Sequence, residues 1–323
     1  MISFEPKRYE PFQHDQFEVS AEGLGRYVID VSLPASVEEG EKYPVILVTD
    51  GNLFFDLVQS VAHGRSQMLG SIMPPAVLVG VGYPGDEGAA SFYGRRNYDF
   101  HDDWEMTDPL GLTLHGIFDG MKAMEGKPDL EMHAGGAPRF QEFLSRELLP
   151  GLAGHYPIDL EGRHTLVGDS SGGHFVLRTL YDENSPFSRY VCISPGFGSA
   201  LDSIKEREAR FAAAHDDLDV DLFLCSGAAE VDGDTTMGLC RFGSGITWVA
   251  EQFAIRGWPS ARVHWEIMDK EDHGSIAPRA ISAGLRSVHR RRPGVHTQEL
   301  AAAMVEFSEK AGMEAAGLGK SDE

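Results

Sequence analysis

A serine between two glycines carries the strongest chemical signal in the sequence. Ser170 has one glycine two residues before it and another two residues after it. An apolar run precedes this motif and an amphipathic pattern follows it, which is the strand–Gly-x-Ser-x-Gly–helix order of a nucleophile elbow. The small glycines let strand and helix approach closely, and the turn exposes the serine Oγ above the sheet. We therefore predict Ser170 as a nucleophile; the alternative is a glycine-rich turn with an ordinary N-cap serine.

The next residue is suited to a different task. Ser171 has Asp169 rather than a glycine two residues before it, so it does not fit the nucleophile position. Its backbone N–H opens the predicted helix, where it can stabilise a negatively charged oxygen. A second N–H for such an oxyanion hole is expected from the loop after an early strand. That loop follows residues 45–48 and contains Gly51 and Asn52, either of which we predict as the donor; the alternative is a plain Asp-Gly turn.

A serine nucleophile needs a general base, and the base needs an acid that orients it. His273 stands between the last predicted strand and a helix that begins near Pro278, and we predict it as the base. Glu230 is the first carboxylate after the apolar run that ends at Cys225, and we predict it as the acid. Three further acids of these loops remain alternatives: Asp232, Asp234 and Asp272. Other histidines lie in a strand pattern, in a helix or in a basic stretch: His174, His264, His289 and His296. We also expect the negative charges of the carboxylates in these two loops to raise the pKa of His273.

Short apolar runs rich in β-branched residues predict the strands that must position these loops. They lie at residues 27–33, 45–48, 76–81, 165–167, 190–193, 220–225 and 262–268. Helical apolar spacing lies between them, at residues 138–152, 171–181, 245–256 and 277–290. This alternation predicts a doubly wound α/β fold with a mostly parallel sheet and sites at the carboxyl ends of its strands. The first run alternates and stops at Pro34, so we expect an outer antiparallel strand there.

Residues 101–134 do not fit this alternation. They show no strand pattern, and we predict a long irregular insertion that is either a lid or a surface excursion. Side chains before and inside the insertion are candidates for lining a substrate pocket: Tyr93, Arg95, Arg96 and Trp104. An arginine there would bind a carboxylate or phenolate, and the alternative is an internal ion pair with Asp99. The His-Asp-Asp cluster at 101–103 is interpreted as an exposed acidic loop rather than a cation site.

The composition excludes several other classes of protein. With 28 basic and 50 acidic residues among 323, the formal net charge is −22, which disfavours nucleic acids and anionic membranes as partners. A hydrophobic share of 42% and a charged share of 24% are typical of a soluble globular chain. We find no signal-peptide pattern and no membrane-spanning run. No motif requires a metal or a cofactor. An odd number of cysteines without a disulfide framework predicts a cytoplasmic protein: Cys192, Cys225 and Cys240.

These residues resemble the esterase D-like branch of the α/β-hydrolases, the putative-esterase family, over residues 43–285. The resemblance rests on Asp50-Gly51-Asn52, on segments 95–100, 135–137 and 140–150, and on Ser170, Ser194-Pro195 and His273. It implies hydrolysis of an ester or thioester, and the Asp50-Gly51-Asn52 loop looks most like that of the siderophore-esterase and feruloyl-esterase group. The chain departs from the family pattern after Phe100, where Thr-Pro is replaced and the insertion begins.

We therefore predict one α/β-hydrolase domain over residues 1–314, with the insertion at about 101–134 and a flexible tail at 315–323. The expected activity is that of a serine esterase acting on a small-molecule carboxylic ester through an acyl-enzyme. Alternatives are an acyltransferase with the same triad, a thioester hydrolase and a non-catalytic hydrolase-like binding protein. A further amphipathic pattern at 298–311 would cap the domain or pair with a second subunit, so a homo-oligomer is also expected as an alternative.

Overall fold

The computed structural model describes residues 12–34, 37–66, 73–231 and 236–290, and the findings below concern these residues. Several sequence predictions lie outside them. These are the amphipathic pattern at 298–311, the tail at 315–323, His296, and the alternative acids Asp232 and Asp234.

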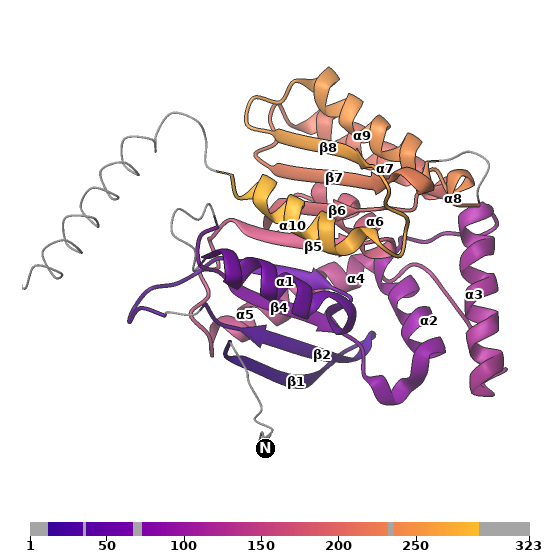
Figure 1. Cartoon of the computed structure of the whole chain (residues 1–323), viewed down its shortest axis with the longest axis horizontal. Helices are drawn as coiled ribbons and strands as arrows, with labels where there is room; N and C mark the ends of the chain where they lie inside the picture. The colour runs from indigo at the N-terminus through magenta and orange to yellow at the C-terminus, as the bar shows by residue number, and fades with distance from the viewer. Residues whose placement is uncertain (1–11, 35–36, 67–72, 232–235, 291–323) are drawn as a thin grey trace, which may run out of the picture.

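One mostly parallel sheet of eight strands organises the described residues (Figure 1), with the order β1-β2-β4-β3-β5-β6-β7-β8. The strands are β1 His14–Ala21, β2 Gly25–Ser32, β3 Val45–Thr49, β4 Val77–Gly82, β5 His164–Asp169, β6 Phe187–Ile193, β7 Asp221–Gly227 and β8 Arg262–Met268. The predicted strands are all present, and β2 is antiparallel to β4 as expected. The additional strand β1 pairs with β2 at one end of the sheet. The α/β prediction is confirmed.

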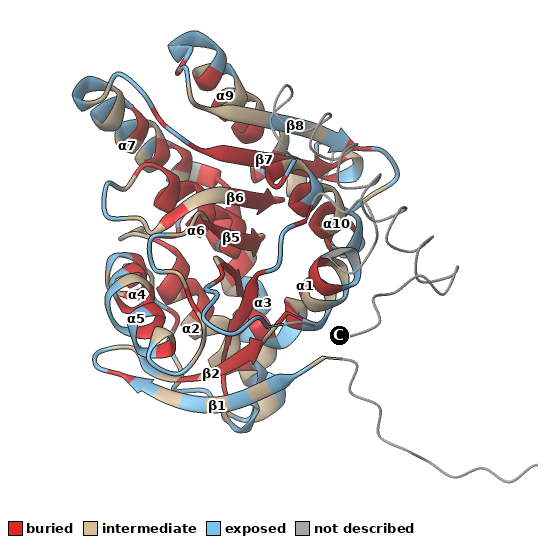
Figure 2. Cartoon of the chain, turned by 90° about the vertical axis from the view of Figure 1, so that its left-hand side faces the viewer, coloured by how far each residue is buried: buried red, intermediate tan, exposed pale blue. Residues whose placement is uncertain are grey.

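Helices cover both faces of this sheet (Figure 2). They are α1 Gly51–Ser66, α2 Gly88–Phe100, α3 Pro109–Glu125, α4 Ala137–Glu142, α5 Leu149–Ala153, α6 Ser171–Leu180, α7 Leu201–Ala214, α8 Thr236–Leu239, α9 Phe242–Arg256 and α10 Ile276–Val288. Helices α1 and α10 bury Phe55, Val58 and Ile281 in one apolar cluster against the sheet. A larger cluster on the other face includes Phe140 and Phe175 from α4 and α6. The strands between them are buried on both faces, which explains their continuous apolar runs.

The insertion at 101–134 is not irregular throughout, so that part of the prediction is wrong. Helix α3 occupies its middle, begins after an N-cap at Asp108 whose carboxylate accepts the Gly111 N–H at 2.8 Å, and ends at the left-handed Gly126. Leu110, Leu114 and Phe118 recur every four residues on its buried face. The exposed apolar side chains of the same helix obscure this period in the sequence: Leu112, Ile117 and Met124.

The insertion packs at the edge of the sheet where the parallel strands end (Figure 1). Its apolar side chains form a third cluster with Phe242, the first residue of α9. The Asp102 carboxylate anchors the start of the insertion through ion pairs with Arg178 of α6, at 2.9 Å, and Arg207 of α7, at 2.8 Å. Asp102 is therefore part of a structural ion-pair network between three segments.

Candidate active site

The turn from β5 into α6 holds Ser170 in a conformation that few side chains adopt. Its φ of 59° and ψ of −120° lie outside the usual regions, and its N–H donates to the Ile193 carbonyl at 2.9 Å. A Cβ at position 168 would collide with the Gly172 carbonyl. A Cβ at position 172 would lie 2.5 Å from Thr49 Oγ1 at the end of β3. The glycines of the motif are thus required by close packing, as in a nucleophile elbow.

His273 and Glu230 come together with Ser170 at the carboxyl ends of three parallel strands, β5, β7 and β8. The Nε2 atom of His273 lies 3.0 Å from Ser170 Oγ, and its Nδ1 contacts Glu230 Oε1. Because a carboxylate only accepts hydrogen bonds, Nδ1 carries the proton and Nε2 is free to accept one from the serine. The arrangement has the geometry of a Ser-His-acid triad.

The Glu230 carboxylate is fixed by its own surroundings. It is 1% exposed, and its Oε2 accepts hydrogen bonds from Ser194 Oγ at 2.7 Å and from the Gly227 N–H. Ser194 has a φ of 42° at the end of β6. Sequence reasoning placed Ser194 in a family motif without giving it a task, and the structure places it beside the predicted acid.

The described alternatives to these residues, Asp272 and three of the histidines, make other contacts. The exposed Asp272 accepts the N–H groups of Gly274 and Ser275, at 2.9 and 3.0 Å, within its own turn. His174 is buried and stacks on His101. Two further histidines named as alternatives contact residues of the sheet rather than Ser170: His264 and His289.

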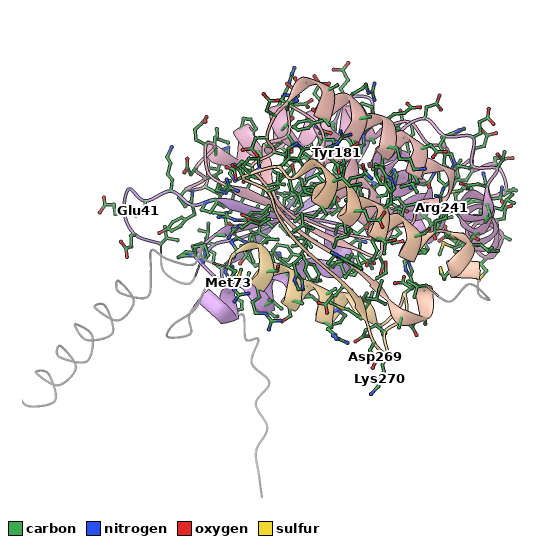
Figure 3. All side chains as sticks on the ribbon, turned by 90° about the horizontal axis from the view of Figure 1, so that it is seen from above. Glu41, Met73, Tyr181, Arg241, Asp269 and Lys270 are labelled. Carbon is green, nitrogen blue, oxygen red and sulfur yellow. The ribbon has the colours of Figure 1, made fainter. Side chains whose placement is uncertain are left out.

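The pKa of His273 is raised, and the causes differ from those expected. Burial lowers it, but the hydrogen bond to Glu230 and the charge of Asp169 outweigh burial. Asp269 and Lys270 instead lie at the exposed tip of the loop after β8 (Figure 3). The predicted effect on His273 is therefore present, whereas the acids of its own loop are not its source.

Asp169, next to the nucleophile, was missed as a site residue. It is 8% exposed, its Oδ1 has no hydrogen-bond partner among the described residues, and burial raises its pKa to about 7. The charges of His273 and Arg96 act in the opposite direction. Its position in the Gly-x-Ser-x-Gly motif is the only sequence signal that could have identified it.

The predicted oxyanion residues also meet at this edge. Strands β3 and β5 are parallel neighbours with Val48 opposite Val167, so the residues that follow, Asp50 and Gly51, lie beside the elbow. At the start of α1 the N–H groups of Leu53 and Phe54 already donate to the Asp50 carbonyl, at 2.8 and 3.1 Å. The first two N–H groups, those of Gly51 and Asn52, precede them at positions where a helix has no internal acceptor. Ser171 opens α6 on the other side.

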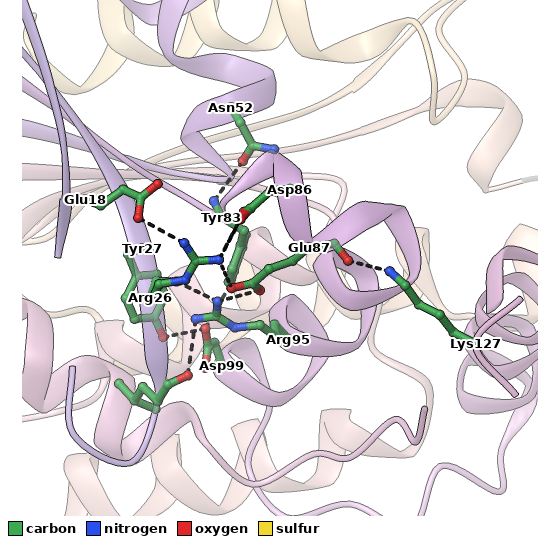
Figure 4. Close-up of polar contacts among 11 residues, drawn as sticks. Glu18, Arg26, Tyr27, Asn52, Tyr83, Asp86, Glu87, Arg95, Asp99 and Lys127 are labelled. Carbon is green, nitrogen blue, oxygen red and sulfur yellow. Dashed lines mark hydrogen bonds and ion pairs between the residues drawn. The ribbon is translucent and has the colours of Figure 1, made fainter. Parts of the chain in front are cut away.

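The structure separates the two arginines that were candidates for the substrate pocket. Arg96 is 7% exposed and forms a bidentate ion pair with Asp50, at 3.0 and 2.8 Å. Arg95 instead donates to Glu87 and to the carbonyl of Arg26 (Figure 4). The Asp99 carboxylate accepts the hydroxyl groups of two tyrosines, Tyr27 at 2.7 Å and Tyr83 at 3.0 Å.

The aromatic candidates pack with the insertion. Tyr93 and Trp104 are half-buried against the third apolar cluster, and the Arg96 guanidinium lies 5.8 Å from the Tyr93 ring centre. Phe242 of the same cluster, which sequence reasoning missed, lies edge-on to the His273 ring with centres 5.1 Å apart. Within the described ranges no group of three metal-ligating side chains comes together, and no helix is long and apolar enough to cross a membrane.

The chain is similar to several known proteins. Residues 122–262 match the family described as "Putative esterase". The ferri-bacillibactin esterase BesA of Bacillus subtilis is 27% identical over 266 residues, which cover 80% of this chain and 83% of the relative. The siderophore enterobactin esterase of Emericella nidulans is 28% identical over 201 residues, which cover 60% of this chain and 61% of the relative.

The solved siderophore hydrolase EstA from Aspergillus nidulans has a TM-score of 0.73 at 22% identity, over 90% of this chain and 98% of that one. A BES protein from Bacillus cereus has a TM-score of 0.70 at 24% identity, over 89% and 99%.

Proposed function

We propose that this chain, a carboxylic ester hydrolase similar to the Putative esterase family, works through an acyl-enzyme formed on Ser170. One observation carries the proposal: the Ser170 Oγ lies 3.0 Å from an imidazole nitrogen of His273, whose other nitrogen contacts the buried Glu230. This order of contacts supports Ser170 Oγ as the attacking atom, His273 Nε2 as the proton acceptor and Glu230 as the group that stabilises the resulting charge.

In the first half of the reaction Ser170 Oγ bonds to the ester carbonyl carbon while His273 Nε2 takes its proton. Glu230 stabilises the imidazolium through Nδ1–H, and the oxyanion is stabilised by the Ser171 N–H together with the Gly51 or Asn52 N–H. The carbon–oxygen bond to the alcohol then breaks, and the leaving oxygen takes the proton from His273.

In the second half a water molecule attacks the acyl carbon. His273 Nε2 takes a proton from that water, a new tetrahedral oxyanion forms in the same hole, and the bond to Ser170 Oγ breaks. The serine recovers its proton from His273, and the acid product leaves. In an acyltransferase an alcohol replaces the water at this step, so only the acceptor would differ.

For the substrate we propose a small-molecule ester of the siderophore class, because two curated relatives are named as siderophore esterases. A screen would compare ferric and iron-free siderophore esters with short p-nitrophenyl esters and feruloyl esters. Selectivity for the siderophores supports the substrate class. Product that depends on an added alcohol would instead identify acyl transfer. We propose a cytoplasmic location for this reaction, because three buried free cysteines suit a reducing compartment.

Fluorophosphonate labelling tests the nucleophile. We expect one covalent adduct on Ser170, lost in Ser170→Ala together with ester turnover. The matched control is Ser171→Ala, which keeps the backbone N–H and should keep the label. Normal turnover by Ser170→Ala, or a label on Ser171, would overturn the proposed mechanism.

A further inference from the structure

Strand β8 ends the sheet on the side away from β1, and among the described strands it has a neighbour on one side only. Figure 2 shows β7 buried and β8 largely half-buried or exposed. An open strand edge presents a row of N–H and C=O groups that can pair with another chain, so natural proteins usually protect it. Strand β8 is seven residues long and contains neither proline nor lysine.

The hydrogen bonds of β8 define which backbone groups face outward. The Arg262 N–H donates to the Val220 carbonyl at 2.8 Å, and in a parallel pair alternate residues bond to the same neighbour. The N–H and C=O groups of the intervening residues therefore point away from β7. These residues are Val263, Trp265 and Ile267.

The side chains of the same three residues share one face of the sheet, because side chains alternate along a strand. Trp265 is 44% exposed and Ile267 is 36% exposed, so apolar surface follows the open edge. On the opposite face His264 lies 4.0 Å from Glu266 and stacks on Phe223. The edge thus has an apolar face and a polar face, with open backbone groups between them.

We propose that β8 is a homodimer edge, at which a second copy of this chain pairs with it antiparallel around a two-fold axis at Trp265. This register places Val263 opposite Ile267, His264 opposite Glu266, and Trp265 opposite its own copy. In this register the outward-facing residues of one copy lie opposite those of the other. Three residue pairs therefore form, and each exchanges two N–H···O bonds.

Side-chain complementarity favours a second copy over an unrelated partner. The two-fold axis sets each His264 imidazole against a Glu266 carboxylate, and it does so twice. It also joins two apolar strips into one, with the two Trp265 rings at its centre, and cross-strand aromatic pairs stabilise sheets. The opposite sheet edge lacks such an apolar strip, since the exposed positions of β1 are all polar: His14, Gln16, Glu18 and Ser20.

The charge of the chain sets a condition for this association. Two copies with a formal charge of −22 each repel one another, and salt screens that repulsion. Screening becomes strong between about 0.05 and about 0.5 M salt. We therefore expect a larger fraction of dimer at the higher salt concentration.

Hydrogen–deuterium exchange combined with sedimentation of the full chain tests the dimer. We expect a mass twice that of the monomer, and protection of the amides of Val263, Trp265 and Ile267 that increases with protein concentration. Protection that does not change with concentration would mean that the same chain covers the edge, and would overturn the proposal. A monomer whose outward amides exchange freely at every concentration would also overturn it.

Variants at the edge separate specific pairing from general instability. Trp265→Pro removes the central outward N–H without removing a hydrogen bond to β7, and we expect a monomer. Trp265→Lys should also be monomeric, whereas the matched control Gln16→Lys adds the same charge to β1 and should remain a dimer. Ester turnover and melting temperature report whether each variant is folded.

A charge exchange tests the register itself. His264→Glu or Glu266→His alone places like groups opposite one another, and each should weaken dimerisation about tenfold. The double variant His264→Glu/Glu266→His restores the original pairs and should recover most of the affinity. Double and single variants with equal affinity would overturn the register around Trp265.

Discussion

Arg96 holds Asp50 by two parallel hydrogen bonds, and Asp50 is the residue that precedes the predicted oxyanion donor Gly51. Both partners are buried, and Asp50 has a φ of 51°, a conformation that a non-glycine residue adopts only when its surroundings enforce it. The ion pair therefore fixes the start of α1 beside the nucleophile elbow. Arg96 acts through Asp50 rather than through an exposed guanidinium.

Replacement of Arg96 should lower turnover more than substrate binding. Arg96→Met leaves Asp50 buried without its partner, so we expect a loss of about 3–5 kcal/mol in the free energy of unfolding. If the oxyanion donor moves with Asp50, kcat should fall about 100-fold while KM changes little. Steady-state kinetics and urea unfolding measure the two effects.

Arg95 provides the matched control for this prediction. Arg95→Met removes hydrogen bonds to Glu87 and Arg26, so we expect lower stability with nearly unchanged kcat. An Arg96→Met enzyme with normal kcat and a greatly raised KM would contradict the positioning role. It would indicate that the guanidinium binds substrate.

The acid of the triad is tested by an isosteric replacement. Glu230→Gln no longer stabilises the imidazolium and presents an amide to Nδ1, so kcat should fall by about 10³–10⁴. Ser194→Ala removes only one hydrogen bond to Glu230 and should cost about tenfold or less. Asp272→Asn should retain wild-type kcat. Loss of activity in Asp272→Asn but not in Glu230→Gln would reassign the acid.

The pH dependence of kcat/KM should respond to Asp169. The neutral form of His273 is the active base, and Asp169, where it is ionised near and above its raised pKa of about 7, favours the protonated form of His273 and raises its pKa. Asp169→Asn removes that charge, so the pKa of His273 falls and the acidic limb of the profile moves to lower pH. We expect no displacement in Asp272→Asn, whose carboxylate is turned into its own loop. A displacement in Asp272→Asn alone would support the loop acids as the source of the raised pKa.

Stability at acid pH should depend on two buried imidazoles. His101 and His174 stack with ring centres 5.0 Å apart, and burial lowers their pKa values to about 4 and about 3. A histidine with a depressed folded pKa stabilises the native state above its unfolded pKa of about 6.5, and this contribution is lost as pH falls toward the folded pKa. We therefore expect the free energy of unfolding to decrease between about pH 6.5 and 4.

His174→Phe removes one of these titrations while keeping a ring against Phe197. Urea unfolding at pH 7.5 and 4.5 should show a decrease smaller by about 2 kcal/mol than in the wild type. The matched control is His133→Phe, which makes the same change of side chain at an exposed histidine. Equal pH dependence in wild type and His174→Phe would exclude this imidazole as a source of acid sensitivity.

Much of this arrangement was predictable because its signals are local in sequence. The strand before Ser170, the glycines around it and the helix after it are contiguous, so the elbow can be identified within ten residues. His273 and Glu230 follow apolar runs that form strands, and parallel strands end at the same edge. The three residues predicted as nucleophile, base and acid, Ser170, His273 and Glu230, therefore contact one another in the structure.

The other contacts of the site join residues that are far apart in the sequence, so no local sequence pattern predicts them. Asp50 and Arg96 are 46 residues apart, and the proximity of the Asp50 loop to Ser170 comes from the pairing of β3 with β5, which were built from residues far apart in the chain. The pattern of α3 was missed because three of its apolar residues face solvent. Asp169 was missed because the Gly-x-Ser-x-Gly motif specifies no residue type at its position.

The insertion is attached to the site without contributing a hydrogen bond to the triad. It lies between β4 and β5 in the chain, and the ion pairs of Asp102 anchor it. Its apolar side chains pack with Phe242, which contacts the ring of His273. Mutations in this segment can accordingly change its length and lining while the proton-transfer groups stay in place. The insertion and the proton-transfer groups are encoded by separate stretches of the gene, so sequence changes in the one can accumulate without altering the other.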